Sequence, residues 1–284
     1  MKPFSSEASD LYVPDGTPLP AAVSRTTHLG IGAHQDDLEF MAFHGIIACH
    51  GRSDRWFGGV IVTDGRGSSR SGPYADWTDE QVAAERVREQ RKAADIGEYS
   101  FVAQLGHPSR TVKDAGREEV VDDIHRVLEA CRPETVYLHN PADKHDTHVA
   151  CLLRSLAALR RLPKDRRPKR VYGCEVWRDL DWMVDSDKSP MPVSGPPGLA
   201  ERINGVFATQ IAGGKRYDLA VLGRRMANAT FSDAHASDRE SAMAWAIDLT
   251  PLVHDDAADL TGHVCAYIDR FRGDVVERIR KFSR

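Results

Sequence analysis

The chain has 284 residues, of which 41% are hydrophobic and 28% are charged, and its formal net charge is −4. This composition is that of an ordinary globular protein with room for a sizeable core. The slightly acidic balance argues against a polyanion-binding surface, so we expect no nucleic-acid partner. No apolar run is long enough to span a bilayer, no leader pattern opens the chain, and the five cysteines are scattered without a Cys-x-x-Cys pair. We therefore expect a cytoplasmic protein with no membrane span.

Short apolar segments alternate with segments of helical periodicity from residue 27 onward. The expected strands are 27–32, 56–62, 101–105, 135–139 and 170–177. The expected helices follow the first strand as far as Gly51, and then cover 78–97, 118–132 and about 147–162. This alternation predicts an α/β fold, with a Rossmann-like, mostly parallel sheet and helices on both faces.

The first 24 residues and the part of the chain after residue 177 lack this alternation. Residues 1–24 are polar and rich in proline, which predicts an irregular N-terminal arm. Residues 178–214 contain a cluster of four prolines and predict an irregular insertion, followed by helical segments at 215–228 and 260–282. We expect these parts to belong to one domain that spans residues 1–284.

Polar residues that can carry chemistry begin where the first strand ends. His34, Asp36 and Asp37 lie at the turn between that strand and its helix. The carboxyl ends of the strands form the ligand crevice in open α/β sheets. Two adjacent carboxylates repel each other, and a nearby cation is the simplest way to keep both ionised. The alternative is that this aspartate pair only caps the helix.

A second polar cluster follows the fourth strand, between His139 and His148. It holds three histidines and two aspartates within ten residues, again just past the carboxyl end of a strand. Two such clusters at one sheet edge suggest a metal held by His34, Asp37 and His148. Three protein ligands leave a coordination position open, which is typical of catalytic zinc sites. Read singly, these histidines could also be capping or surface residues.

Two other stretches at the same edge are open to two interpretations. The glycine- and serine-rich loop 63–72 is either a solvated turn or a substrate contact. The aromatic and charged run 177–182 either lines a sugar pocket or packs the insertion onto the sheet.

Both polar clusters resemble the motifs of a known family. Ala33-His-Gln-Asp-Asp37 resembles the Ala-His-Pro-Asp-Asp motif of the PIG-L/LmbE-like zinc-dependent N-deacetylases. Asp143-Lys-His-Asp-Thr-His148 resembles the second family motif, Asp-x-His-Pro-Asp-His. The resemblance extends from about residue 27 to 160 and implies an LmbE-like fold. Gln35 replaces the usual proline, and Thr147 stands where the family commonly has an aspartate.

The resemblance also implies roles for individual residues. His34, Asp37 and His148 would bind Zn²⁺ (or another divalent metal such as Fe²⁺), Asp36 would be the general base, and His145 would stabilise the oxyanion. Arg86, in an Arg-x-x-Glu sequence, would contact the substrate, although Arg88 and Arg91 lie close by. We also place His235 and Asp143 on the substrate side, and Asp143 or Asp146 could instead orient His145.

The expected activity is zinc-dependent hydrolysis of an N-acetyl group on an amino sugar or its conjugate, such as an N-acetylglucosamine derivative. The partner would be that small molecule, and a homo-oligomer is left open. The alternatives are a catalytically degenerate sugar-binding member, a metal-dependent phosphoesterase and a non-haem iron oxygenase. A dinucleotide-binding protein is disfavoured, because Gly30-Ile-Gly32 lacks the third glycine of that fingerprint.

Overall fold

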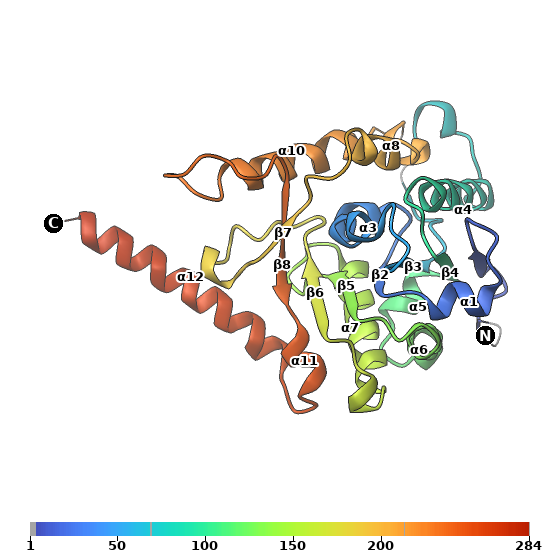
Figure 1. Ribbon diagram of the computed structural model, residues 1–284, viewed down its shortest axis with the longest axis horizontal. Helices are drawn as coiled ribbons and strands as arrows, with labels where there is room; N and C mark the ends of the chain where they lie inside the picture. Colours follow the sequence, from blue (N-terminus) through green and yellow to red (C-terminus); the bar gives the residue numbers. More distant parts are fainter. Residues whose placement is uncertain (1–3, 69, 213, 284) are drawn as a thin grey trace.

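The computed structural model describes residues 4–68, 70–212 and 214–283, and this part of the chain forms an eight-stranded sheet flanked by helices (Figure 1). The N-terminal residues 1–3 of the predicted arm, residue 69 of the loop and residue 213 of the predicted insertion lie outside the described residues. Within the described ranges, no helix combines the length and apolar character needed to cross a bilayer.

The sheet has a parallel centre and antiparallel edges. Its spatial order is β1-β4-β3-β2-β5-β6-β8-β7; β4, β3, β2, β5 and β6 are parallel, whereas β1, β8 and β7 pair antiparallel. The strands are β1 (Asp10–Tyr12), β2 (His28–Gly32), β3 (Phe57–Thr63), β4 (Phe101–His107), β5 (Thr135–His139), β6 (Arg170–Cys174), β7 (Ser189–Pro192) and β8 (Met243–Asp248). The predicted mostly parallel α/β sheet is therefore confirmed.

Helices cover both faces of the sheet (Figure 1). They are α1 (Leu19–Ser24), α2 (Asp37–Met41), α3 (Phe43–Cys49), α4 (Asp79–Ile96), α5 (Ser109–Lys113), α6 (Glu118–Cys131), α7 (Asp146–Arg160), α8 (Leu199–Asn204), α9 (Ala208–Ile211), α10 (Tyr217–Thr230), α11 (Thr250–His254) and α12 (Leu260–Phe282). Helices α1, α6, α7 and α11 close one core, and α2, α3, α4 and α8 close the other. Successive side chains of a strand point to opposite faces, so Val60 enters the first core and Ile61 the second.

The predicted elements of the central sheet are present, with two differences. The single helix expected up to Gly51 is two short helices, because Ala42 leaves the helical conformation (φ −107°, ψ 15°) between α2 and α3. The fifth expected strand ends at Cys174 rather than at residue 177. The predicted start of α4 is confirmed: Thr78 and Gln81 form the two reciprocal hydrogen bonds of a capping box.

The N-terminal arm and the segment 178–214 contain regular structure that the sequence did not predict. In the N-terminal arm, β1 pairs with β4, Asp10 forms an ion pair with Arg91, and α1 follows. The segment 178–214 contains β7, α8 and α9. Pro190 and Pro192 are compatible with β7 because it is an edge strand, where missing N–H donors cost little.

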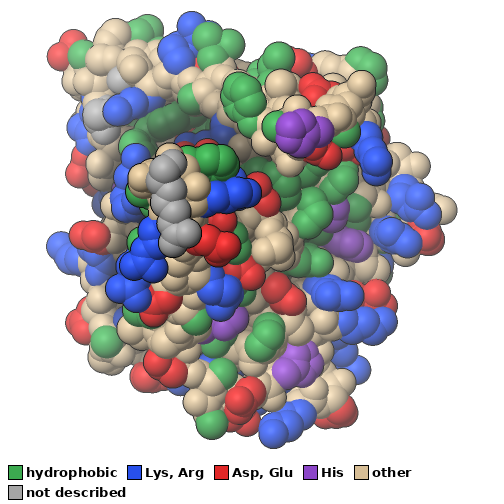
Figure 2. All heavy atoms as spheres, turned by 90° about the vertical axis from the view of Figure 1, so that its left-hand side faces the viewer, with side chains coloured by type: hydrophobic (Ala, Val, Ile, Leu, Met, Phe, Trp, Pro, Cys, Tyr) green, Lys and Arg blue, Asp and Glu red, His purple; other side chains and the backbone are tan. Residues whose placement is uncertain are grey.

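Helix α12 extends away from the sheet toward the C-terminus (Figure 1). Five of its large apolar side chains are exposed: Ile268, Val275, Val276, Ile279 and Phe282. Figure 2 looks at the side of the molecule on which this helix ends, where apolar side chains are interspersed with basic and acidic ones.

Candidate functional site

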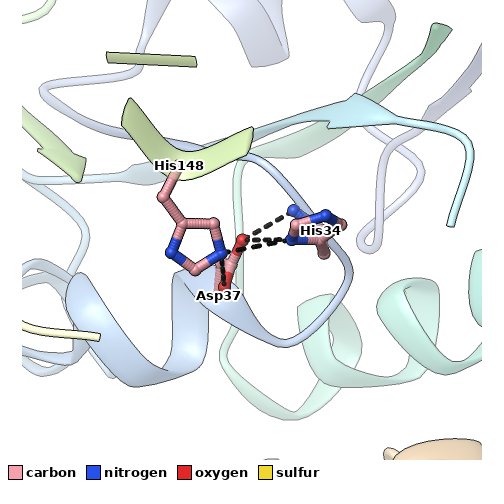
Figure 3. A group of neighbouring side chains, drawn as sticks. All are labelled: His34, Asp37 and His148. Atoms are coloured by element: carbon pink, nitrogen blue, oxygen red, sulfur yellow. Dashed lines mark hydrogen bonds and ion pairs between the residues drawn. The ribbon is translucent and has the colours of Figure 1, made fainter. Parts of the chain in front are cut away.

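The two predicted clusters meet because β2 and β5 are neighbouring parallel strands, with Gly30 opposite Tyr137. His34 and Asp37 follow the end of β2, and His148 lies in the first turn of α7. The Nδ1 atom of His34 is 3.2 Å from Nε2 of His148 and 3.3 Å from Oδ2 of Asp37 (Figure 3). The same His148 nitrogen is 3.4 Å from Oδ1 of Asp37.

These three side chains fit a divalent metal. One ligand atom from each lies within 4.8 Å of the other two. Burial lowers the pKa of His148 to about 4, so its imidazole is neutral at pH 7. Burial alone raises the pKa of Asp37, but the charges of His148 and His139, together with hydrogen bonds, hold it well below the usual range. A neutral imidazole beside an ionised carboxylate is the protonation state that metal binding requires.

Asp143 lies behind His148 rather than in the wall of the cavity. Its Oδ2 is 3.3 Å from Nδ1 of His148 and accepts a hydrogen bond from the amide of Trp177. Its Oδ1 accepts from the amide of His145. This carboxylate can therefore fix the orientation of His148 and leave Nε2 for a metal. The sequence placed Asp143 on the substrate side, and the structure gives it this different position.

His139 is a further part of the site for which the sequence suggested no role. It is fully buried at the end of β5, and its Nε2 is 3.4 Å from Oδ2 of Asp37 and 2.9 Å from the amide nitrogen of Ala33. With Asp143 and His148 it forms a second group of potential ligand atoms within 4.8 Å of one another. The sequence did contain a signal for this role: His139 is the last residue of a buried strand and the first of the second polar cluster.

Asp36 is buried and lines a cavity. Its backbone φ is +103°, in the left-handed region that residues other than glycine rarely adopt. Burial, reinforced by the charge of Asp37 and opposed by Arg86, raises the pKa of this carboxyl well above its usual value. Both aspartates line the cavity but have different surroundings: Asp37 lies among three histidines, whereas Asp36 is under the influence of the Arg86 charge.

Arg86 is the arginine of its helix that reaches this cavity. It is 1% exposed, and its Nη1 donates a hydrogen bond to the carbonyl of Gly65. Its Nε and Nη2 have no hydrogen-bond partner among the described residues. Arg88 pairs with Glu85, and Arg91 pairs with Asp10. The structure thereby settles which arginine of the three faces the site.

Glu89, one helical turn after Arg86, anchors a distant segment. Its carboxylate accepts hydrogen bonds from the amide and the hydroxyl of Thr209, at 2.8 Å and 2.6 Å. The Arg-x-x-Glu sequence therefore serves both the cavity and the attachment of α9.

The cavity has a volume of about 640 Å³. We call the lining residues around the candidate ligands its inner end: His34, Asp36, Asp37, Arg86, His145 and Thr147. We call the remaining lining residues its outer part: Phe40, Gly65, Gly67, Ser68, Ser109, Lys113, Val176, Trp177, Gln210, Lys215, Tyr217, Ala220, Val221 and Arg224. The loop 63–72 thus contributes to the wall. Of the run 177–182, Trp177 lines the cavity, whereas Trp182 packs against the core.

The predicted oxyanion stabiliser His145 and the predicted substrate-side residue His235 differ in position. His145 lines the cavity, its ring centroid is 5.1 Å from that of His34, and burial followed by the charge of His34 lowers its pKa. His235 lies on an exposed loop after α10 and is not part of the cavity lining among the described residues. The sequence did not indicate Tyr217, whose pKa is raised to about 12 by burial and by the charge of Asp36.

Solved structures with the same fold include different enzymes. GalB, the 4-carboxy-2-hydroxymuconate hydratase from Pseudomonas putida KT2440, is 19% identical with a TM-score of 0.58, over 79% of this chain and 96% of that chain. N,N'-diacetylchitobiose deacetylase from Pyrococcus horikoshii is 14% identical with a TM-score of 0.59, over 78% and 83%. The A40926 pseudoaglycone deacetylase Dbv21 is 16% identical with a TM-score of 0.53, over 79% and 97%. At these identities the likeness establishes the fold.

No curated protein sequence shows significant similarity to this chain. A family profile does: residues 29–159, from β2 to the end of α7, match PIG-L, described as GlcNAc-PI de-N-acetylase. The matched range contains both polar clusters and Arg86, in agreement with the resemblance drawn from the motifs. The chain therefore carries a domain of the PIG-L family over residues 29–159.

Proposed function

We propose that this protein is a metal-dependent hydrolase that removes an N-acetyl group from an amino sugar or its conjugate. The observation that carries the proposal is the cluster of His34, Asp37 and His148 at the inner end of a cavity that also exposes Asp36. The family description and the two deacetylases of the same fold support this chemistry. The fold alone does not select it, because a hydratase shares that fold.

His34, Asp37 and His148 would hold the metal, and zinc fits two imidazoles and a carboxylate. When bound there, a divalent ion supplies Lewis acidity to the acyl oxygen and lowers the pKa of water. Asp143, whose Oδ2 lies next to Nδ1 of His148, would hold this imidazole so that Nε2 is free to bind the ion.

Asp36 is the proposed general base. Its carboxylate accepts a proton from the attacking water and then delivers it to the departing amine nitrogen. A pKa raised by burial suits this role, because the group must hold a proton between the two steps. Asp37 cannot serve, since its oxygens lie among the three histidines.

His145 is the proposed donor to the acyl oxygen. Its ring lines the same cavity beside His34, and its lowered pKa makes the neutral imidazole, with one N–H, the donor at pH 7. Negative charge grows on that oxygen as the tetrahedral intermediate forms. One well-placed donor at such a position contributes roughly 3–4 kcal/mol.

The test is acetate release from N-acetylated sugars and their conjugates, with and without a chelator and after the metal is restored. We expect acetate release that the chelator abolishes and added Zn²⁺ restores. Release of phosphate from phosphorylated sugars, with no acetate from any N-acetylated probe, would instead favour the phosphoesterase alternative. Zinc binding with no turnover of any probe would favour a degenerate sugar-binding protein.

A further inference from the structure

The outer part of the cavity carries positive charge. Of the residues that line it, Lys113, Lys215 and Arg224 are cationic and lie outside the proposed metal centre. The carboxylates in the described lining are Asp36 and Asp37, both at the inner end. Once a divalent ion is bound there, the cavity as a whole is electropositive.

The two lysines have no compensating anion of their own. Neither Lys113 nor Lys215 takes part in an ion pair within the described ranges of the chain. Arginines nearby in the sequence behave differently: Arg216, next to Lys215, pairs with Asp218, and Arg117, four residues after Lys113, pairs with Glu119. Arg224 donates a hydrogen bond to the carbonyl of Val176, and its charge acts on the buried Glu175. The lysines therefore offer the uncompensated charge.

Aromatic rings lie beside these cations. The Nζ of Lys215 is 5.6 Å from the ring centroid of Trp177. Tyr217 packs edge-on against Trp177 and tilted against Phe40, with centroids 5.9 Å and 5.8 Å apart. Such ring faces suit the apolar faces of a sugar, and the cavity volume of about 640 Å³ is enough to hold a sugar ring.

We propose that the substrate carries an anionic group, a carboxylate or a phosphate, which lies between Lys113 and Lys215 while the N-acyl group lies at the inner end of the cavity. Lys113 comes from α5, in the PIG-L domain, and Lys215 from the segment just before α10. The anion would thus be contacted by both parts of the chain. This inference rests on the proposed function and specifies its substrate class.

The experiment compares neutral and anionic N-acetylated sugars on the metal-loaded protein. The neutral probe is the methyl glycoside of N-acetylglucosamine, the phosphate probe is N-acetylglucosamine 1-phosphate, and the carboxylate probe is N-acetylmuramic acid. We expect kcat/KM for acetate release to be at least about tenfold higher for one anionic probe, and this preference to shrink as ionic strength rises. The two anionic arms distinguish a carboxylate from a phosphate.

Variants assign the preference to the lysines. The double substitution Lys113→Gln and Lys215→Gln should lower the anionic-to-neutral ratio of kcat/KM by about tenfold, and Lys215→Arg should retain it. Lys92→Gln is the matched control, because Lys92 is exposed on α4 and does not line the cavity; it should leave the ratio unchanged.

Separate outcomes bear on this inference and on the proposed function. Efficient acetate release with equal kcat/KM for neutral and anionic probes overturns the anionic substrate and leaves the hydrolase intact. Lysine-dependent binding of an anionic probe in calorimetry, without acetate release from any probe, overturns the hydrolase and supports the anionic ligand. If no anionic probe binds or reacts better than the neutral one, the inference is wrong.

Discussion

The PIG-L domain and the segment 176–224 that follows it contribute different things to one cavity. Residues 29–159 supply the candidate metal ligands, Asp36 and His145 from segments that follow parallel strands, and Arg86 from α4. The segment from 176 to 224 supplies the larger part of the outer wall, including Trp177, Lys215 and Tyr217. The proposed chemistry is thus carried by the matched domain, and the proposed recognition of the substrate is shared between Lys113 of that domain and the unmatched segment.

Contacts join the two regions near the site. Glu89 holds Thr209, and the guanidinium of Arg225 on α10 donates to the carbonyls of Glu39 and Phe40 on α2. Arg225 is fully buried, and its burial lowers its pKa to about 9. Because α2 begins at Asp37, the outer wall is attached to the same helix that carries a candidate ligand.

The largest expected effect lies in the PIG-L domain. Asp36→Asn should lower kcat by about 10³-fold or more, because the amide cannot accept a proton from water. Bound zinc, measured by atomic absorption, should remain near one per chain. If zinc is lost together with activity, Asp36 belongs to the coordination shell instead. His148→Ala is the contrasting variant and should lose both.

A smaller effect is expected at Asp143, which contacts the candidate ligand His148 and does not itself belong to the proposed ligand set. Asp143→Asn should weaken zinc affinity by about 10- to 100-fold, since the hydrogen bond that orients His148 is replaced by a weaker one. Competition with a fluorescent chelator measures this affinity. Asp146→Asn is the control, as Asp146 is exposed at the start of α7. Equal affinities in the two variants would assign Asp143 a purely structural role.

The contact between the two regions is tested by Glu89→Gln. The amide retains one acceptor but loses the charge that holds Thr209, so we expect the free energy of unfolding to fall by about 1–2 kcal/mol. KM should rise a few-fold while kcat changes little, because the outer wall is loosened and the metal end is not. Glu85→Gln, on the same helix and paired with Arg88, is the control. A fall in kcat with unchanged KM would contradict this division of roles.

The smallest effect concerns acid stability at the other end of β2. Burial, followed by the charge of His44, lowers the pKa of His28 from 6.5 to about 4. The unfolded chain therefore takes up a proton at higher pH than the folded one, and stability falls as the pH drops from 6.5 toward 4. For this partly exposed ring we expect a loss of about 1 kcal/mol between pH 7 and 5. His28→Gln should reduce that loss in urea titrations, and an unchanged pH profile would refute the assignment.

The sequence revealed the parallel centre because buried strands and amphipathic helices leave strong periodic patterns there. The same patterns placed His34, Asp37 and His148 at one edge, since parallel strands end on the same side. It did not reveal β1, which has three residues, or β7, in which two prolines obscure the strand pattern. Nor could it reveal the role of Glu89, because its partner Thr209 lies 120 residues away and is brought near only by tertiary packing.

His34 and His148 are 114 positions apart and become neighbours only when β2 and β5 pair. During synthesis, the growing polypeptide therefore lacks the complete ligand set until residue 148 has left the ribosome and the centre of the sheet has formed. An ion that prefers the finished arrangement also resists its opening, by about 2.7 kcal/mol when free metal exceeds the dissociation constant a hundredfold. If the proposed metal binds here, its supply in the cell would bear on how long each molecule survives as well as on how fast it works.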